Sequence, residues 1–382
     1  VVLSNNDGCV VARSQEVRDL GVKMAAPWFQ IRTLAERHGI IALSSNYTLY
    51  ADMSNRVMSL LADFSPHQEI YSIDECFLDL SGFKHLDYTA YGQRIRTMIK
   101  QHVGLPVCVG ISASKTLAKL ANHVAKKRHS YAGVCDFNAL DADALDALLG
   151  TIAVGEVWGV GPRIAARLID MDITTVLDLK RAPPKMIRTQ FSVVLERTVA
   201  ELNGEACLTL EEIAPPKQQI MASRSFGEYV YTLEELAQAV VTYTTRAAEK
   251  LRRQASLAGA IQVHIRTNPF KPDAPQYQRG LIVPLPDPSD DTRQLVRAAL
   301  FGLRRLYRPG FAYQKAGVVL SELIPIAQRP RTLFDDSAAQ ARSQSLMRVM
   351  DGINRIMGEH TLHLLGEQPC LKSSVFRVPR GI

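Results

Sequence analysis

Two adjacent carboxylates, Asp74 and Glu75, are the residues of this sequence best suited to chemistry. They stand between a strand-like run at 69–73 and an apolar run that begins at Cys76. An acidic pair held between strands is costly unless a cation lies beside it, and divalent metal ions bind carboxylate oxygens readily. The pair therefore indicates a metal site on a hairpin, suited to phosphoryl or nucleotidyl transfer. Taken alone, the two residues also fit a solvated acidic turn, which is the commoner arrangement.

A second set of candidate residues shares one face of the helix predicted over residues 114–127. At 100° per residue, Lys115, Lys119, Asn122 and Lys126 fall on one side of the helix, and apolar residues fall opposite. Lysines stacked on one stripe repel one another unless they share an anion, and ammonium groups bind phosphates as point charges. The face therefore suits a triphosphate, although a solvated face of an amphipathic helix explains it as well.

Residues 158–163 carry groups that fit the phosphate backbone of DNA. Gly159 and Gly161 precede a helix that includes Arg163, and a second helical unit follows from Met171. Glycine lets the backbone approach a ligand closely, and free amides at a helix N-terminus bind phosphate oxygens. The pattern predicts a helix-hairpin-helix, which holds duplex DNA without reading its sequence. A plain helix–helix turn is the alternative.

The positive charge of the chain is concentrated in one segment. The formal net charge is +7 and the isoelectric point is about 9.1. Residues 217–325 contain 15 Lys and Arg against 9 Asp and Glu, so this segment alone carries +6. Such an excess is typical of a nucleic-acid-binding module, although a merely soluble basic domain would show it too. The side chains predicted to face phosphates there are Ser223, Arg224, Ser225 and Arg266.

The elements that must position these groups follow from the apolar periodicity. Strands and helices alternate up to about residue 140, which predicts an α/β layer. Residues 141–212 are predicted to be helical, and a proline-rich linker follows at 214–217. Residues 219–325 predict a compact α+β module with the order strand, helix, strand, strand, helix, strand. One more helix is predicted near 341–357.

The bulk composition bounds the class of protein. A chain of 382 residues exceeds one ordinary core, so roughly two to four domains are expected. It is 47% hydrophobic and 22% charged, and no apolar run approaches the ~20 residues of a membrane span. The six cysteines are scattered and form no C-x-x-C pair. We therefore expect free thiols in the cytoplasm, no zinc site and no membrane association.

Taken together and in order, these motifs resemble the Y family of DNA polymerases. The resemblance is to its UmuC-type branch, the catalytic subunits of bacterial translesion DNA polymerase V. It covers almost the whole chain and runs through 2–10, 45–47, 50–56, IYSIDE at 70–75, KTLAKLAN at 115–122, VWGVG at 157–161, 194–199 and SRSFG at 223–227. It implies an α+β multidomain fold, the right-hand polymerase. The expected parts are fingers with an N-terminal palm hairpin at 1–65, palm at 66–140, helix-hairpin-helix thumb at 141–213, little finger at 219–325 and C-terminal tail at 326–382.

The resemblance also implies roles for particular residues. In such polymerases two Mg²⁺ ions bridge three carboxylates and the incoming nucleotide, a dNTP, at the end of the primer–template DNA. Asp74 and Glu75 match the second and third of these carboxylates. Lys126 matches a lysine that contacts the triphosphate, with Lys119 on the same face, and Arg18 matches an arginine of the fingers near the triphosphate.

One part of the family pattern precedes the segment where this chain starts. The first catalytic aspartate and the aromatic gate that excludes ribonucleotides belong to that part, and Asp7 does not replace the aspartate because it falls in a hairpin turn. We therefore expect an N-terminally truncated and nearly inactive form of a polymerase, with the first palm strand absent. A non-enzymatic DNA-binding remnant is the alternative. A nucleotide cyclase-like palm enzyme shares the acidic hairpin but does not explain the thumb.

The resemblance implies a biological setting as well. It predicts error-prone lesion bypass in the SOS response, in company with a processed UmuD-type partner dimer and a recombinase filament. A sliding-clamp peptide is matched at its apolar end by Leu333 and Phe334, whereas Pro330 occupies the place expected for glutamine. Clamp binding and an ordinary exposed loop are both open interpretations of this segment.

Overall fold

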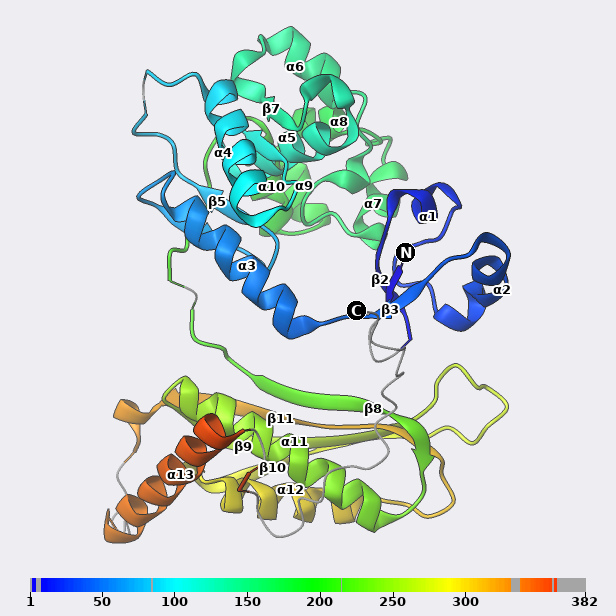
Figure 1. Ribbon diagram of the computed structural model, residues 1–382, viewed down its shortest axis with the longest axis vertical. Coiled ribbons are helices and arrows are strands. Elements are labelled where there is room, and N and C mark those ends of the chain that lie inside the picture. The colour runs from blue at the N-terminus through cyan, green and yellow to red at the C-terminus, as the bar shows by residue number, and fades with distance from the viewer. Residues whose placement is uncertain are drawn as a thin grey trace. The chain divides into compact units, whose positions relative to one another are not determined.

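The computed structural model of the protein describes residues 2–4, 8–83, 85–213, 215–330, 337–358 and 361–362. The chain forms two compact units, one of Val1–Ser45 with Pro215–Ile382 and one of Asn46–Ala214 (Figure 1). The second division, between Ala214 and Pro215, lies in the proline-rich segment predicted as a linker. Within the described residues, no helix has the length and apolar character needed to cross a membrane.

Residues 2–45 contain three short strands and two helices. β1 (Val2–Ser4) is the central strand, antiparallel to β2 (Val10–Arg13) and parallel to β3 (Ala42–Ser44). The pairing predicted for the first hairpin is thereby confirmed, although most of its turn, with Asp7, lies outside the described residues. α1 (Gln15–Asp19) and α2 (Trp28–His38) complete this part. Its small core consists of Val2, Val10, Val17 and Val22.

Residues 46–140 alternate helices with short strands. The order is α3 (Tyr47–Ala62), β4 (Gln68–Ile70), β5 (Cys76–Leu78), α4 (Tyr88–Val103), β6 (Val109–Ile111), α5 (Lys115–Lys127) and β7 (Val134–Asp136). β4 and β5 form an antiparallel hairpin, whereas β6 and β7 pair in parallel as a separate sheet. The described strands thus form separate small sheets in place of the single α/β layer predicted. Each of these strands has only 3 residues, so packing against helices supplies much of the core.

Helix α5, which carries the predicted lysine face, packs directly on strand β6 at Gly110. A Cβ atom at this position would lie 2.1 Å from the backbone nitrogen of Asn122 and 2.3 Å from the carbonyl oxygen of Ala118. No side chain tolerates backbone atoms so near, so glycine is what lets the helix lie here. The apolar face of α5 is the predicted one, with Leu117, Leu120, Ala121 and Val124 buried.

Residues 141–213 are helical, as predicted. The helices are α6 (Ala142–Leu149), α7 (Pro162–Ile169), α8 (Val176–Arg181), α9 (Pro184–Gln190) and α10 (Val193–Leu202). They share one apolar core with α5, to which Leu120, Leu168 and Val199 contribute fully buried side chains. The lysine helix is therefore held between β6 on one side and this helical part on the other.

The buried side chain of Glu201 joins α10 to the start of α5. Glu201 is 0% exposed. One carboxylate oxygen accepts hydrogen bonds from the backbone nitrogen and the hydroxyl of Thr116, at 2.9 and 2.7 Å. The other accepts from the backbone nitrogens of Cys207 and Leu208, at 3.2 and 3.0 Å. Because Thr116 lies in the first turn of α5, the carboxylate also faces the positive end of the helix dipole.

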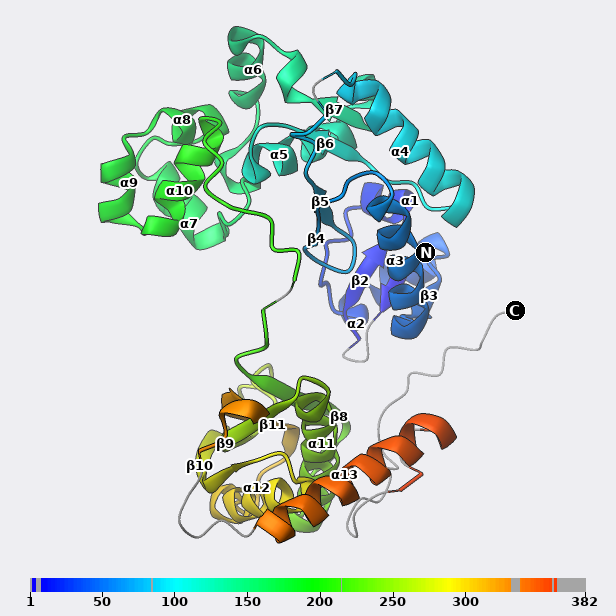
Figure 2. The ribbon, with the colours of Figure 1, turned by 90° about the vertical axis from the view of Figure 1, so that its left-hand side faces the viewer.

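Residues 217–325 fold in the predicted order of strands and helices. The elements are β8 (Ile220–Val230), α11 (Leu233–Arg253), β9 (Ser256–Thr267), β10 (Gln278–Ser289), α12 (Thr292–Leu306) and β11 (Tyr313–Pro325). Neighbouring strands are antiparallel, and the spatial order is β10-β9-β11-β8. α11 and α12 pack on one face of this sheet (Figures 1 and 2). Alternate strand residues therefore point away from the two helices.

Helix α13 (Ser337–Met357) docks on this module. Arg252 of α11 donates to both carboxylate oxygens of Asp351, at 2.6 and 2.7 Å. The Ser343 hydroxyl donates to Asp291, and Met347 is buried. The helix predicted near 341–357 is thus confirmed, and charged contacts attach it to the module.

Candidate functional site

The predicted acidic hairpin is present, and its turn exposes both carboxylates to solvent. The backbone nitrogen of Ser72 donates to the carbonyl oxygen of Glu75 at 3.0 Å, which closes the turn between β4 and β5. The Ser72 hydroxyl donates to Asp74 Oδ1 at 2.7 Å, so the serine orients one carboxylate. The side chains of Asp74 and Glu75 are exposed. The structure therefore places two carboxylates side by side in the chain where a cation from solvent can reach them.

Helix α3 places two residues near this turn to which the sequence analysis gave no role. The Ser54 hydroxyl donates to the carbonyl oxygen of Ile73. Tyr50 lies one helical turn before Ser54. Burial raises the pKa of the Tyr50 phenol above its ordinary value of 10.0, and the charge of Asp74 raises this pKa further. Tyr50 is therefore a protonated phenol beside the acidic pair at neutral pH. The signal available in the sequence was the four-residue spacing of these two polar side chains, which places them on one side of helix α3.

The first lysine of the α5 face has a buried protein partner. Lys115 Nζ forms an ion pair with Glu69 of β4, and the two side chains are only 10% and 9% exposed. Lys115 also donates to the carbonyl oxygen of Thr209 at 2.7 Å, and Glu69 accepts from the backbone nitrogen of Glu211 at 2.8 Å. The prediction that all three lysines share one bound anion is therefore wrong for Lys115, because Glu69 already neutralises it within the protein.

The second lysine of this face reaches the acidic pair itself. Lys119 Nζ lies 2.9 Å from Glu75 Oε2. It also lies over two aromatic rings, 4.6 Å from the centroid of Tyr71 and 5.1 Å from that of Trp158. The indole nitrogen of Trp158 donates to the Tyr71 hydroxyl at 3.1 Å, and the two rings meet edge to face. Lys126, the third lysine, is exposed.

The acidic pair fits a divalent cation that is shared with a phosphate ligand. Mg²⁺ is typically held by one or two carboxylates, with waters and substrate phosphate oxygens in its other positions. Asp74 and Glu75 supply two carboxylates, and Lys119 and Lys126 supply positive charge for the phosphates. No three His, Cys, Asp or Glu side chains of the described residues are grouped so as to hold a metal ion by themselves. The arrangement supplies part of a metal site, whose remaining positions a phosphate ligand and further oxygen ligands can fill.

The two glycines predicted to approach DNA lie in an exposed turn before helix α7. Gly159 has a φ of +86°, which side-chain-bearing residues rarely adopt, and Gly161 is the N-cap of the helix. Arg163, in the first turn of α7, is also exposed. The second helical unit begins at Thr175, which forms a capping box with Asp178. The turn of the first unit therefore offers backbone amides and a guanidinium to a phosphate.

Strand register brings three of the four residues predicted to face phosphates onto one sheet face. Lys315 of the central strand β11 pairs with Ser225 of β8 on one side and Arg266 of β9 on the other. Gly317, two residues further along β11, pairs with Ser223. Directly opposed residues of antiparallel strands project to the same face of a sheet. Ser223, Ser225 and Arg266 therefore share a face with Lys315, which sequence analysis did not single out.

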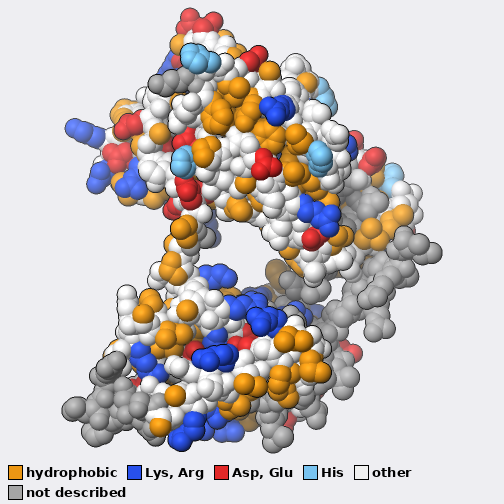
Figure 3. Space-filling view, turned by 60° about the vertical axis from the view of Figure 1, so that its left-hand side comes forward, with side chains coloured by type: hydrophobic (Ala, Val, Ile, Leu, Met, Phe, Trp, Pro, Cys, Tyr) orange, Lys and Arg blue, Asp and Glu red, His pale blue; other side chains and the backbone are white. Residues whose placement is uncertain are grey.

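Arg224 alternates to the opposite face of the same sheet. It pairs with Ala316, a residue of the core beneath the helices, and it is exposed because β8 is an edge strand. On the face of Arg266, burial lowers the pKa of His264, and the charges of Lys315 and Arg266 lower this pKa further. The module is visibly basic, since Lys and Arg side chains gather over it in the lower half of Figure 3.

Comparison with known proteins identifies the family. The model of the impB/mucB/samB family matches residues 1–123, and the model of the C-terminal domain of that family matches residues 217–333. Protein UmuC of Salmonella typhimurium is 47% identical over 369 residues, which are 96% of this chain and 87% of that protein. The chain belongs to the impB/mucB/samB family of UmuC-type Y-family DNA polymerases.

More distant polymerases agree with this membership. DNA polymerase IV of Desulfatibacillum aliphaticivorans is 26% identical over 364 residues, which are 94% of this chain and 87% of that protein. A solved Y-family DNA polymerase chimera of Dbh and Dpo4 superimposes with a TM-score of 0.65 at 20% identity, over 85% of this chain and 92% of that one. At this identity the likeness concerns the fold, and it confirms the predicted α+β multidomain polymerase.

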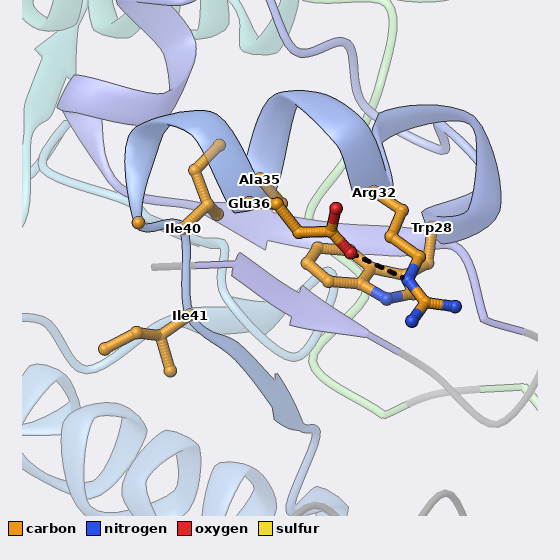
Figure 4. A pocket seen from close by; sticks show the side chains of 7 residues that line it. Trp28, Arg32, Ala35, Glu36, Ile40 and Ile41 are labelled. Atoms are coloured by element: carbon orange, nitrogen blue, oxygen red, sulfur yellow. Dashed lines mark hydrogen bonds and ion pairs between the residues drawn. The ribbon is translucent and has the colours of Figure 1, made fainter.

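The remaining predicted site residues of this UmuC-type polymerase are Arg18, Leu333 and Phe334. Arg18 is exposed on α1, in the compact unit that does not contain the hairpin. Leu333 and Phe334, predicted to bind a sliding clamp, lie outside the described residues. A cavity of about 370 Å³ also contains none of the predicted site residues, and the 3.1 Å ion pair of Arg32 with Glu36 lies along it (Figure 4). Its lining is Trp28, Arg32, Ala35, Glu36, Gly39, Ile40 and Ile41.

Proposed function

We propose that this UmuC-type polymerase copies damaged DNA templates by metal-assisted nucleotidyl transfer at Asp74 and Glu75. The observation that carries the proposal is the exposed pair of carboxylates on the β4–β5 turn, with Lys119 2.9 Å from one of them. Membership of the impB/mucB/samB family supports translesion synthesis, and the family resemblance supports a place in the SOS response. The substrates are then primer–template DNA and a dNTP.

In this proposal the residues of the acidic turn bind the metal, and those of α5 bind the triphosphate. Asp74 and Glu75 hold Mg²⁺, of which two ions are expected. When bound, Mg²⁺ activates the primer 3′ hydroxyl and neutralises charge on the triphosphate. Lys126 and Lys119 bind triphosphate oxygens as point charges, and Arg18 adds a guanidinium from the fingers. Holding the triphosphate in one orientation removes much of the entropic part of the barrier.

The proposed DNA contacts lie on the thumb and the little finger. The exposed turn at Gly159 and Gly161 binds phosphates through backbone amides, with Arg163 alongside. The basic little finger binds the DNA backbone through charge, independently of base sequence, so that affinity falls steeply with salt. Its proposed contact residues are Ser223, Arg224, Ser225 and Arg266.

The proposed metal site requires one carboxylate more than the described residues bring together. Asp74 and Glu75 are adjacent, and among the described residues no third ligand of the His, Cys, Asp or Glu type joins them in a metal-binding group. The family resemblance predicts that an aspartate of the first palm strand supplies it.

Primer extension with Mg²⁺ on a template with an abasic site tests the proposal. We expect robust synthesis by the full-length protein. In that chain Asp74→Asn and Glu75→Gln should each lower the rate at least about a hundredfold, because bound metal supplies several kcal/mol. Asp143→Asn, which removes an exposed carboxylate from α6, is the control.

Two results would contradict the proposal. Undiminished synthesis by Asp74→Asn and Glu75→Gln would exclude these residues as metal ligands. Failure of the full-length protein to extend any primer, while it still binds DNA and the partner proteins are present, would favour a non-enzymatic DNA-binding remnant.

The partners, the cytoplasmic location and the domain limits are proposals that rest on the resemblance. The partners are a processed UmuD-type dimer, a recombinase filament and a sliding clamp. The domain limits are those given above for fingers, palm, thumb, little finger and tail. For the clamp, a pull-down in which Leu333→Ala with Phe334→Ala retains full binding would exclude the proposed contact.

A further inference from the structure

Two lysines one helical turn apart on α5 form ion pairs of different character. The pair of Lys115 with Glu69 is buried and is tied to the backbone at Thr209 and Glu211. The pair of Lys119 with Glu75 is more open, with side chains 21% and 47% exposed. A half-exposed ion pair contributes little net stability, so it can be broken at small cost. The Lys115–Glu69 pair therefore has a structural role, whereas the Lys119–Glu75 pair can open at small cost.

Two aromatic rings keep the ammonium of Lys119 near Glu75 even when the ion pair is open. The ammonium lies over both Tyr71 and Trp158, and cation–π attraction strengthens as water is excluded. The hydrogen bond from the Trp158 indole to the Tyr71 hydroxyl fixes the two rings relative to each other. Tyr71 belongs to the acidic hairpin, and Trp158 directly precedes the glycine turn of the thumb. Lys119 is thus held between these two parts of the site.

A divalent cation at Asp74 and Glu75 competes with this ammonium. The metal ion and the ammonium both bind the oxygens of Glu75, and two cations within a few ångströms of each other repel. A triphosphate relieves the competition, because its oxygens can bind the metal and the ammonium at the same time. The electrostatics therefore predict that metal and nucleotide favour each other's binding through the position of Lys119.

We propose that Lys119 is a positioning residue that pairs with Glu75 when no substrate is present and transfers to the triphosphate when a dNTP binds. Glu75 then becomes more available to the metal when the nucleotide arrives. The inference rests on the proposed function, since it takes Asp74 and Glu75 as the metal ligands. By linkage, the coupling is reciprocal: the metal strengthens nucleotide binding by the factor with which the nucleotide strengthens metal binding.

Titration with Mn²⁺ alone, followed by the electron paramagnetic resonance signal of free Mn²⁺, tests the inference without turnover. The full chain is compared with Lys119→Met, Lys119→Arg, Glu75→Gln and Lys127→Met, each checked for folding by circular dichroism. Lys127 lies on the same helix and pairs with Glu156 at 3.2 Å, so its variant removes the same charge away from Glu75. Lys119→Arg keeps the charge over the aromatic rings and separates charge from packing.

We expect Lys119→Met to bind Mn²⁺ about fivefold more tightly, the factor that corresponds to losing one competing exposed ion pair. Lys119→Arg and Lys127→Met should bind as the unchanged chain does, and Glu75→Gln should lose binding. A non-hydrolysable dNTP should raise the Mn²⁺ affinity of each chain. This increase should be about fivefold smaller in Lys119→Met than in the unchanged chain.

The outcomes separate this inference from the proposed function. Loss of Mn²⁺ binding in Glu75→Gln, with unchanged or weaker binding in Lys119→Met, would overturn the role of Lys119 and leave the metal site standing. Unchanged Mn²⁺ binding in Glu75→Gln would show that the metal does not bind at the acidic hairpin, and it would refute both proposals. If Lys119→Met does not fold, equal Mn²⁺ affinities of Lys119→Gln and the unchanged chain would equally refute the competition.

Discussion

Substitution of Glu201 tests whether a buried carboxylate holds the lysine helix in place. Glu201→Gln keeps the size of the side chain but turns one acceptor oxygen into an NH₂ donor. That nitrogen would face either the two donors of Thr116 or the backbone nitrogens of Cys207 and Leu208. In either orientation two donors lose their acceptor: those of Thr116 are buried, and those of Cys207 and Leu208 are partly buried.

The magnitude follows from those lost acceptors. A buried donor left without a partner costs about 1–3 kcal/mol, and the amide nitrogen can turn toward the two partly buried donors, which lie at the lower end of that range. We therefore expect Glu201→Gln to lower the free energy of unfolding of the Asn46–Ala214 unit by about 2 kcal/mol. Glu196, on the same helix, pairs with Arg188 at 3.2 Å, and the Arg188 side chain is 63% exposed. Glu196→Gln should therefore cost less than about 0.5 kcal/mol, and it is the matched control.

Urea unfolding followed by tryptophan emission measures both variants. The chain has 2 tryptophans, and a Trp28→Phe background leaves Trp158 to report on the unit that contains Glu201. Equal midpoints for Glu201→Gln and Glu196→Gln would refute the reasoning. That result would mean that apolar packing places α5 and that the four hydrogen bonds to the carboxylate add nothing.

Other predictions concern packing, DNA binding and pH. Gly110→Ala should lower the free energy of unfolding of the same unit by about 3 kcal/mol, because its Cβ would overlap the backbone of α5, whereas Gly82→Ala has open space and should change little. Equal urea midpoints of these two variants would contradict the direct contact. Arg266→Ala should weaken primer–template binding and reduce the slope of log affinity against log salt by roughly one unit. Arg224→Ala, on the other sheet face, should weaken primer–template binding less. Fluorescence anisotropy across salt concentrations measures both variants, and a larger loss of affinity in Arg224→Ala than in Arg266→Ala would contradict the prediction. Because burial and neighbouring positive charges lower the pKa of His264, its imidazole is neutral at pH 7. DNA affinity should therefore stay constant between pH 7 and 8, and a rise toward pH 7 in anisotropy titrations would show that an imidazolium contributes.

The sequence by itself determined the local elements of this polymerase, because short-range patterns set them. Apolar runs around the acidic pair predicted the β4–β5 hairpin, and helical periodicity predicted the lysine face of α5. Apolar periodicity also predicted the order of strands and helices in 217–325. Strands β3 and β7 were not predicted, because no acidic pair marks these 3-residue runs as one marks the equally short β4 and β5. The motifs also indicated the family, because they occur together and in order.

Only the tertiary structure decided which of these charged groups meet. Lys115 lies 46 positions from its partner Glu69, and Lys119 lies 44 positions from Glu75. Nothing in the local pattern of α5 distinguishes the two lysines, yet burial makes the first pair structural and exposure leaves the second releasable.

Strand register had the same effect in the module of residues 217–325. Arg224 and Ser225 are neighbours in sequence, and a step of one residue along a strand reverses the sheet face, so only pairing with β11 showed which of them joins Arg266. The sequence thus determined the chemical groups and the elements that carry them. Their partners depended on the tertiary structure, because burial and proximity arise from contacts between segments far apart in the chain.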